Sequence, residues 1–328
     1  MLRKNKPPPP KLTTPQPPAG ILELERFNEA SLTKWLNVSC DLDQLAGELY
    51  YSIRPDQNRF RANILEALRS VPGKALTLQN WSRIVSYRYT LQPLSCLGSM
   101  LTIGGRFNPG AELDPGTMAP FPALYVATDY ETAFREKFQI ASGTTVDGLS
   151  PQELALEMGA SHSTVLLRGE VHNIFDMTLR NLEPVASIFR KIKMPPRAQA
   201  LKKKLGTREL KMVTTAADLY RTVLDFNWRQ SPVQFGLPAP SQVLAEFIRA
   251  AGFEGVYYKS SKGPGHCLAL FPDRLQDASY LELADAAPAE LKYPRMDFES
   301  APELSGYDQL PSQARKLLMS LGLLGGTA

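Results

Sequence analysis

The chain has 328 residues, 43% of them hydrophobic and 21% charged, and carries a formal net charge of +4. This is the composition of an ordinary globular protein with enough apolar material for a sizeable core, and no internal repeat is visible. The basic excess is small for this length and gives only weak support for a nucleic-acid partner, because nucleic-acid-binding domains usually concentrate their basic residues on one face.

The cysteine and histidine pattern argues against disulfides and metal. Cys40, Cys96 and Cys267 are widely spaced and form neither a disulfide framework nor a CxxC pair, and the three histidines are equally scattered. We therefore expect no metal site and a reducing compartment. Basic residues followed by prolines open the chain, which excludes an ordinary secretory signal. No stretch approaches the roughly 18 apolar residues that span a bilayer, so we expect a soluble, cytoplasmic protein at its site of action.

Two different segments precede the main part of the chain. Residues 1–20 contain seven prolines and almost no large apolar side chains, which predicts a disordered, proline-rich arm. From Ile21 onwards apolar residues recur at three- and four-residue spacing, which predicts a helical region over residues 21–78.

A strand, a loop, a second strand and a helix are predicted next. Residues 84–90 (IVSYRYT) alternate and are rich in β-formers, which predicts a strand. A glycine-punctuated loop containing GGRFNPG at 104–110 leads to a short apolar strand, ALYVAT, at 123–128. The sequence from Thr128 to Glu131 matches a capping box and predicts a helix that runs to about residue 141.

The later elements are read in the same way. Residues 163–178 contain two β-like runs with a turn expected near Gly169, and 216–228 and 240–252 predict helices, the second ending at Gly252. Two short strands follow, and the tail from about residue 276 is mixed and ends in a helix-like run. The two strands are EGVYYKSS at 254–261 and HCLALF at 266–271, and the terminal run is SQARKLLMSLGLL at 312–324.

Four side chains in the first half of the chain are candidates for a site, and each has a plain structural alternative. Arg106 between glycines and an Asn-Pro turn can bind a phosphate or carboxylate through two hydrogen bonds, or be a solvated turn residue. Tyr125 can offer a stacking face or be a core residue. Glu136 points away from the aromatic stripe of its helix, towards water or a cleft. Arg88 can line a pocket or lie on an exposed sheet.

The order of these motifs resembles the RES domain, a family named for its Arg, Glu and Ser. The early matches are YRYT at 87–90, GGRFNP at 104–109, FPALYVA at 121–127 and Glu136. A later segment, AGFEGVYYKSS at 251–261 followed by GPGHCLALF, resembles the family's late serine segment and identifies Ser260 as the counterpart of the family serine, with Ser261 adjoining it. Arg83 competes with Arg88 for the place of the first arginine.

The resemblance implies an α+β fold similar to ADP-ribosyltransferases: a split mixed β-sheet core with surrounding helices, here with an N-terminal helical region added. It places the RES domain at residues 79–275, with an expansion around 179–240, and a C-terminal extension at 276–328.

The resemblance also implies an enzyme that consumes NAD+ as substrate, by hydrolysis or with inorganic phosphate as co-substrate, and that needs no cofactor. Family members are usually toxins neutralised by an Xre-like antitoxin, so an antitoxin or an immunity protein is the expected partner. Arg88 and Arg106 would hold the pyrophosphate or phosphate, and Tyr125 would stack on nicotinamide. Glu136 would stabilise the developing ribosyl cation, and Ser260 would donate a hydrogen bond to phosphate or carboxamide.

Two other functions compete with this one. The first is an ADP-ribosyltransferase that modifies a protein or a nucleic acid. The second is a non-catalytic binding protein that uses the basic run RKIKMPPRAQALKKKLGTREL at 190–210, whose plain alternative is a solvated surface.

Overall fold

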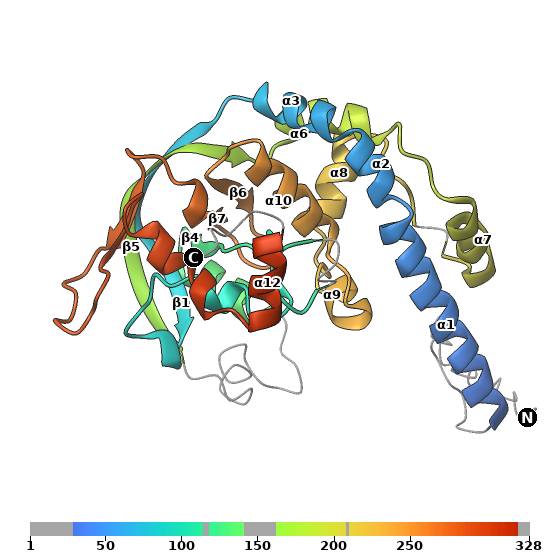
Figure 1. The fold of residues 1–328 in the computed structure, drawn as a ribbon, viewed down its shortest axis with the longest axis horizontal. Coiled ribbons are helices and arrows are strands. Elements are labelled where there is room, and N and C mark those ends of the chain that lie inside the picture. The colour runs from blue at the N-terminus through green and yellow to red at the C-terminus, as the bar shows by residue number, and fades with distance from the viewer. Residues whose placement is uncertain (1–28, 114–117, 141–161, 208–209, 321–328) are drawn as a thin grey trace, which may run out of the picture.

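The structure is a computed structural model that describes residues 29–113, 118–140, 162–207 and 210–320. The predicted proline-rich arm, residues 1–20, lies outside these ranges. The predicted α+β class is confirmed, since a large mixed sheet is surrounded by helices and preceded by a helical region (Figure 1). None of the described helices is long and apolar enough to cross a membrane.

The main sheet has seven strands in the order β1-β4-β7-β6-β5-β8-β9. A second pairing of β1 with β5 closes the first five of these strands into a ring. Only the β5–β6 pairing is parallel, so the sheet is mixed. The strands are β1 (Lys74–Ser86), β4 (Leu124–Ala127), β5 (His162–Asp176), β6 (Gly255–Lys259), β7 (His266–Leu270), β8 (Tyr280–Leu283) and β9 (Arg295–Met296).

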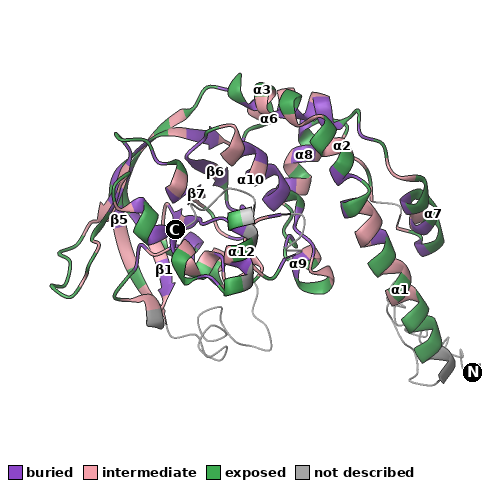
Figure 2. Ribbon diagram, in the orientation of Figure 1, coloured by how far each residue is buried: buried purple, intermediate pink, exposed green. Residues whose placement is uncertain are grey.

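Alternation along the strands divides the core into two clusters. Successive side chains of a strand point to opposite faces, so Leu124 and Val126 of β4 join Leu268 of β7 in one cluster. Tyr125 and Ala127 belong with the other cluster, on the face that the helices cover. Figure 2 shows the buried residues concentrated around β4, β6, β7 and the neighbouring helix α10. The face that carries Tyr125 is the face on which a site can form.

Helices cover that second face and extend beyond it. The N-terminal helices are joined to α10 by Arg54 and Arg61, which both form ion pairs with Glu246. Helix α1 projects away from the sheet, with α7 packed beside it (Figure 1). The helices are α1 (Glu29–Tyr51), α2 (Arg54–Arg59), α3 (Arg61–Arg69), α4 (Tyr130–Phe138), α6 (Leu179–Phe189), α7 (Pro196–Leu205), α8 (Ala216–Val223), α9 (Gln230–Phe235), α10 (Pro240–Ala250), α11 (Ala301–Ser305) and α12 (Ser312–Ser320).

Part of the basic run at 190–210 is used inside the fold. In α7, Lys204 pairs with Asp41 of α1 at 2.6 Å, and Arg197 lies 3.4 Å from Glu48 of the same helix. These exposed pairs contribute little stability each. They nevertheless assign two of the basic side chains to an intramolecular contact.

Three sequence-based boundaries change. The helical region gives way to β1 at Lys74, inside the predicted 21–78 segment, because residues 74–78 alternate and pair with β5. Strand β5 runs unbroken through Gly169, where a turn was predicted; Gly169 has φ +154°, and a Cβ there would overlap the backbone of β8. Within the predicted C-terminal extension, β8 and β9 add to the same sheet as the preceding strands.

The strand predicted over 84–90 ends at Ser86. Residues Tyr87–Tyr89 form a 3₁₀ turn, so Arg88 does not stand in an alternating strand. The pairing of β1 with the described part of β5 ends at the Ser86–His162 pair, where the turn begins. The side chain of Arg88 lies outside what the structure describes.

Glu254 is a buried carboxylate that joins three segments of this fold, and its side chain is 0% exposed. It accepts hydrogen bonds from the backbone N–H of His172 (3.1 Å) and Asn173 (3.3 Å) of β5, and from that of Gln276 (2.8 Å). Ser279 donates to it from its hydroxyl. A buried charge is tolerated when donors surround it in this way.

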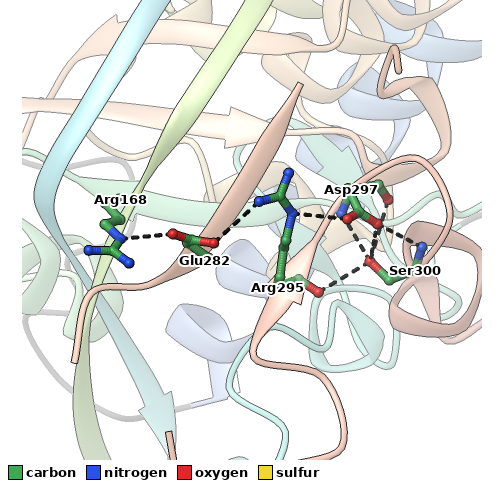
Figure 3. Close-up of polar contacts among 5 residues, drawn as sticks. All are labelled: Arg168, Glu282, Arg295, Asp297 and Ser300. Carbon is green, nitrogen blue, oxygen red and sulfur yellow. Dashed lines mark hydrogen bonds and ion pairs between the residues drawn. The ribbon is translucent and has the colours of Figure 1, made fainter. Parts of the chain in front are cut away.

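The outer edge of the sheet carries a contrasting, exposed set of charges. Glu282 of β8 accepts hydrogen bonds from Arg168 of β5 at 2.8 Å and from Arg295 of β9 at 3.3 Å, and Arg295 also contacts Asp297 (Figure 3). Water screens these pairs, so each is worth less than a buried one.

We predict that Glu254→Gln lowers the free energy of unfolding by about 1–3 kcal/mol, because an amide cannot accept from all of these donors. Glu282→Gln is the matched control and should change it by no more than about 1 kcal/mol. Urea unfolding followed by circular dichroism measures both. Equal losses in the two variants would contradict the assigned role of Glu254.

Candidate active site

The GGRFNP segment is a tight loop fixed by a buried asparagine. Gly104–Gly105 (β2) pairs with Asn108–Pro109 (β3), and Gly104 has φ +84°, a conformation that glycine adopts without strain. The Asn108 Oδ1 atom accepts from the backbone N–H of Gly105 at 3.0 Å and from the Tyr125 hydroxyl at 2.8 Å. The turn therefore presents Arg106 at a fixed position beside Tyr125.

A second buried amide, Gln242 of α10, holds the same loop from behind. Its Nε2 atom donates to the carbonyl oxygens of Ile103 (2.9 Å), Gly105 (2.9 Å) and Asn108 (3.0 Å). Its Oε1 atom accepts from the backbone N–H of Ala239 at 2.8 Å. Gln242 was not among the residues singled out from the sequence, where it appears only as a polar position within an apolar helix.

Tyr125 lies beneath this loop with its hydroxyl fully engaged. The hydroxyl accepts from the backbone N–H of Phe107 at 2.9 Å while it donates to Asn108. Burial raises the pKa of Tyr125 well above its ordinary value, so the phenol stays protonated. A Cβ at Gly105 would overlap the phenol ring, which shows how closely the loop packs on it. These contacts assign Tyr125 a role in positioning the loop.

Glu136 and Ser260 are in direct contact. The Ser260 hydroxyl donates to Oε1 of Glu136 at 2.6 Å, and it accepts from the backbone N–H groups of Lys262 (3.0 Å) and Gly263 (2.8 Å). A serine has a single hydroxyl proton, and here the hydroxyl uses it for the hydrogen bond to the Glu136 carboxylate. The structure thus brings together two predicted site residues that are far apart in the sequence.

Helix α4 and the β6–β7 loop are docked together, and this sets the Glu136–Ser260 contact. The cap of α4 is Asp129 instead of the predicted Thr128, and it accepts from the backbone N–H of Thr132 at 2.7 Å. The hydroxyls of Thr132 and Thr128 in turn accept from the backbone N–H groups of Gly265 and His266. Thr128 is therefore used to bind the loop and not to cap the helix.

Arg106 is 3% exposed and fixed at two of its three nitrogens. Its Nη1 atom donates to the carbonyl oxygen of Asp225 at 2.8 Å, and its Nη2 atom donates to the Ser261 hydroxyl at 2.6 Å. Among the described residues Nε has no partner. The guanidinium also lies 5.7 Å from the centre of the Trp228 ring. A buried arginine with an unused donor can still bind an anionic ligand by donating a hydrogen bond to it.

A cavity of about 240 Å³ opens between these elements. Three of the predicted site residues line it: Arg106, Tyr125 and Glu136. Ser260 reaches the site through its bond to Glu136. Trp228 and Arg229 also line the cavity. They were not predicted as site residues, because they lie in a segment with no recognisable motif.

Arg83 lines the cavity too, but its donors are occupied by the backbone. It donates to the carbonyl oxygens of Pro93 (2.7 Å), Tyr125 (3.0 Å) and Ser95 (3.0 Å). Burial lowers the pKa of Arg83, although not enough to neutralise an arginine under ordinary conditions. Its contacts brace β4 against the 93–95 segment, which is a structural role.

Two further ionisable groups lie near Glu136. The pKa of Lys262 is lowered to about 8, mainly by burial and also by the charge of Arg106, while the charge of Glu136 opposes the shift. Burial raises the pKa of the Cys267 thiol well above its ordinary value, so this cysteine is a poor nucleophile. In the part of the chain that the structure describes, no group of three or more His, Cys, Asp or Glu side chains could hold a metal ion.

Comparison with known proteins bears on the family. Residues 185–293 match the family model of the RES domain. The resemblance read from the sequence is confirmed by this match. The matched segment contains Ser260, Gln242 and Trp228, whereas Arg106, Tyr125 and Glu136 precede it.

One solved structure and the curated proteins complete the comparison. The chain is similar to a chain of the M. tuberculosis MbcT–MbcA toxin–antitoxin complex, with 14% sequence identity over 74% of this chain and 97% of that one, and a TM-score of 0.38. No curated protein matches the chain.

We predict that Gln242→Met loosens the GGRFNP loop, because three buried carbonyl oxygens lose their donor. The free energy of unfolding should fall by about 2–4 kcal/mol, and amide hydrogen exchange in residues 103–110 should accelerate. Gln230→Met is the control, since Gln230 is exposed and its side chain, among the described residues, donates to Gln234 of the same helix. Wild-type exchange rates in the loop of Gln242→Met would show that the clamp is dispensable.

Proposed function

We propose that this protein is an enzyme of the RES type that cleaves the bond between nicotinamide and ribose in NAD+. The observation that carries the proposal is the Glu136 carboxylate on the wall of a cavity, fixed by the Ser260 hydroxyl at 2.6 Å, with the buried Arg106 and the exposed Arg229 lining the same cavity. One anionic group amid several cations suits a substrate that carries both negative phosphates and a carbon that becomes positive.

Cleavage of the nicotinamide–ribose bond needs little help from an acid catalyst. As the bond breaks, its electron pair moves to the nicotinamide nitrogen, which leaves as a neutral molecule. The ribose carbon then carries positive charge, as in the oxocarbenium-like states of glycoside hydrolysis. A carboxylate placed beside that carbon lowers the energy of the charged state, and this is the role we assign to Glu136.

Ser260 takes a different role from the one expected at first. The Ser260 hydroxyl donates a hydrogen bond to Glu136. Ser260 therefore orients the carboxylate and occupies one of the two carboxylate oxygens. The second carboxylate oxygen is left to face the ribose. In hydrolysis, a water oxygen then forms the new bond to the ribose carbon and its proton is lost to the solvent. In phosphorolysis, an anionic oxygen of inorganic phosphate forms that bond and no proton has to be removed.

Arg106 supplies the first contact for the phosphates. It is held rigidly by Asp225 and Ser261, and its Nε donor is unused within the described residues. Preorganised donors of this kind stabilise charge without reorganising during the reaction. We keep Arg88 as a second candidate on the RES resemblance alone.

The biological role that we propose is that of a toxin acting in the cytoplasm and neutralised by a protein partner, either an Xre-like antitoxin or an immunity protein. This rests on the RES-domain match at residues 185–293. Transfer of ADP-ribose to a macromolecule is the competing reaction. Labelled NAD+ separates the two, because transfer leaves the label on a macromolecule whereas hydrolysis or phosphorolysis releases it in a small product.

We predict that Glu136→Gln lowers the rate of NAD+ loss by about 100-fold or more, since it removes the charge and keeps the shape. Glu131→Gln is the control: Glu131 lies on the same helix, is exposed and pairs only with Arg135. Mass spectrometry of the products with and without phosphate gives the rate and the acceptor. NAD+ loss at the wild-type rate in Glu136→Gln would refute the assigned role.

We also predict a pH dependence that comes from Lys262. Its pKa near 8 means that it is charged below pH 8 and loses its charge above. The groups that face it are Arg106, Glu136, Arg229 and Asp225. Loss of this cation weakens attraction for an anionic substrate, so KM should rise by about fivefold between pH 7 and 9.

Lys262→Arg is the matched variant for this effect, because arginine stays charged over the whole range. Its KM should not change between pH 7 and 9, whereas Lys262→Met should have a high KM throughout. A rise in KM with pH in Lys262→Arg equal to the wild-type rise would assign the titration to another group.

A further inference from the structure

Arg106 binds the loop between α8 and α9, residues 224–229, and so holds it next to the site. The carbonyl oxygen of Asp225 accepts from Arg106 Nη1 at 2.8 Å and from the backbone N–H of Trp228 at 3.3 Å. The Asp225 carboxylate accepts from the backbone N–H of Asn227 at 2.9 Å, which closes the turn. Trp228 is thereby placed on the wall of the cavity, where it is 5% exposed.

Cationic side chains surround the aromatic residues of this loop. The guanidinium carbons of Arg106 and Arg229 lie 5.7 Å and 5.5 Å from the centre of the Trp228 ring. The Lys262 ammonium lies 3.0 Å from the centre of the Phe226 ring. These distances are within the range of cation–π attraction. The loop therefore gathers positive charge near the carboxylate of Glu136, which lines the same cavity as Arg106 and Arg229.

Two buried donors at this place have no acceptor among the described residues. They are the Nε atom of Arg106 and the indole Nε1 atom of Trp228. Leaving a buried donor without a partner costs free energy, and such groups in folded proteins need an explanation. Both donors belong to side chains that line the cavity. A ligand rich in acceptor oxygens would satisfy them, and a neutral sugar would not match the charge.

We infer that Trp228 and Arg229 are substrate-contact residues that bind the pyrophosphate group of the substrate. The indole N–H donates to a phosphate oxygen, and Arg229 supplies a charge-assisted hydrogen bond beside it. The substrate class is thereby narrowed to nucleotides with a diphosphate bridge, such as NAD+, in preference to nicotinamide riboside, which has the same scissile bond and no phosphate. This inference rests on the proposed function.

The experiment measures binding of ADP-ribose by isothermal titration calorimetry, since ADP-ribose keeps the pyrophosphate and has no scissile nicotinamide bond. Trp228→Phe keeps an aromatic ring and removes the N–H, and Arg229→Gln removes the charge from an exposed side chain. We expect each variant to bind about tenfold more weakly. Arg229→Lys should recover part of the loss. Trp35→Phe, at an exposed position on α1, should bind as the wild type does.

Steady-state kinetics give the second measurement. In both loop variants KM for NAD+ should rise by about tenfold, with a smaller change in kcat, because the bond to phosphate is present before and during the reaction. The turnover of nicotinamide riboside should be low in the wild type and unchanged in the variants. Wild-type affinity for ADP-ribose in both Trp228→Phe and Arg229→Gln would overturn the inference.

The outcomes separate this inference from the proposed function. If the wild-type protein consumes NAD+ and both loop variants have the wild-type KM, the proposed function is supported. In that case Trp228 and Arg229 do not contact the substrate. Wild-type protein that does not consume NAD+, but binds ADP-ribose in a way that depends on Trp228, supports the pyrophosphate site and refutes the cleavage reaction. Thermal unfolding of each variant confirms that a change in affinity is not a loss of fold.

Discussion

Two buried side-chain amides, those of Asn108 and Gln242, hold the part of the molecule on which the site depends. Between them they bind backbone groups of the GGRFNP loop and the Tyr125 hydroxyl. An amide has both donors and acceptors, so each of these side chains can bind backbone groups of the β2–β3 turn in addition to the pairing between the two strands. The loop consequently has one arrangement, and Arg106 is presented rigidly. Gln242 also joins this loop to α10, which lies in the segment that matches the RES domain.

The sheet then determines which side chains meet. Because side chains alternate along a strand, Tyr125 of β4 and Cys267 of β7 share the face covered by helices, while their neighbours fill the other core cluster. Helix α4 lies over that face and brings Glu136 with it. The β6–β7 loop is bonded to the first turn of α4, and Ser260 reaches the carboxylate for this reason. The position of the Glu136 carboxylate and its contact with Ser260 thus follow from the geometry of the sheet and from the docking of the β6–β7 loop on α4.

Part of the positive charge near that centre, Arg229, comes from a part of the chain with no motif. The α8–α9 loop contributes Trp228 and Arg229, and Arg106 fastens the loop through the carbonyl oxygen of Asp225. The same arginine therefore lies against the cavity and against the loop that forms part of its wall. Lys262, whose pKa is lowered mainly by burial, lies near the same charges.

The sequence by itself determined the α+β class, most of the helices and strands, and three side chains of the cavity: Arg106, Tyr125 and Glu136. The helices and strands follow from local spacing, whereas the α+β class and the three side chains follow from the resemblance of the ordered motifs to the RES domain. Only the tertiary structure decided that Ser260 bonds to Glu136, that β8 and β9 complete the sheet, and that Trp228 lines the cavity. Such contacts join residues far apart in the chain. Their formation depends on strand pairing and burial, which local periodicity does not encode.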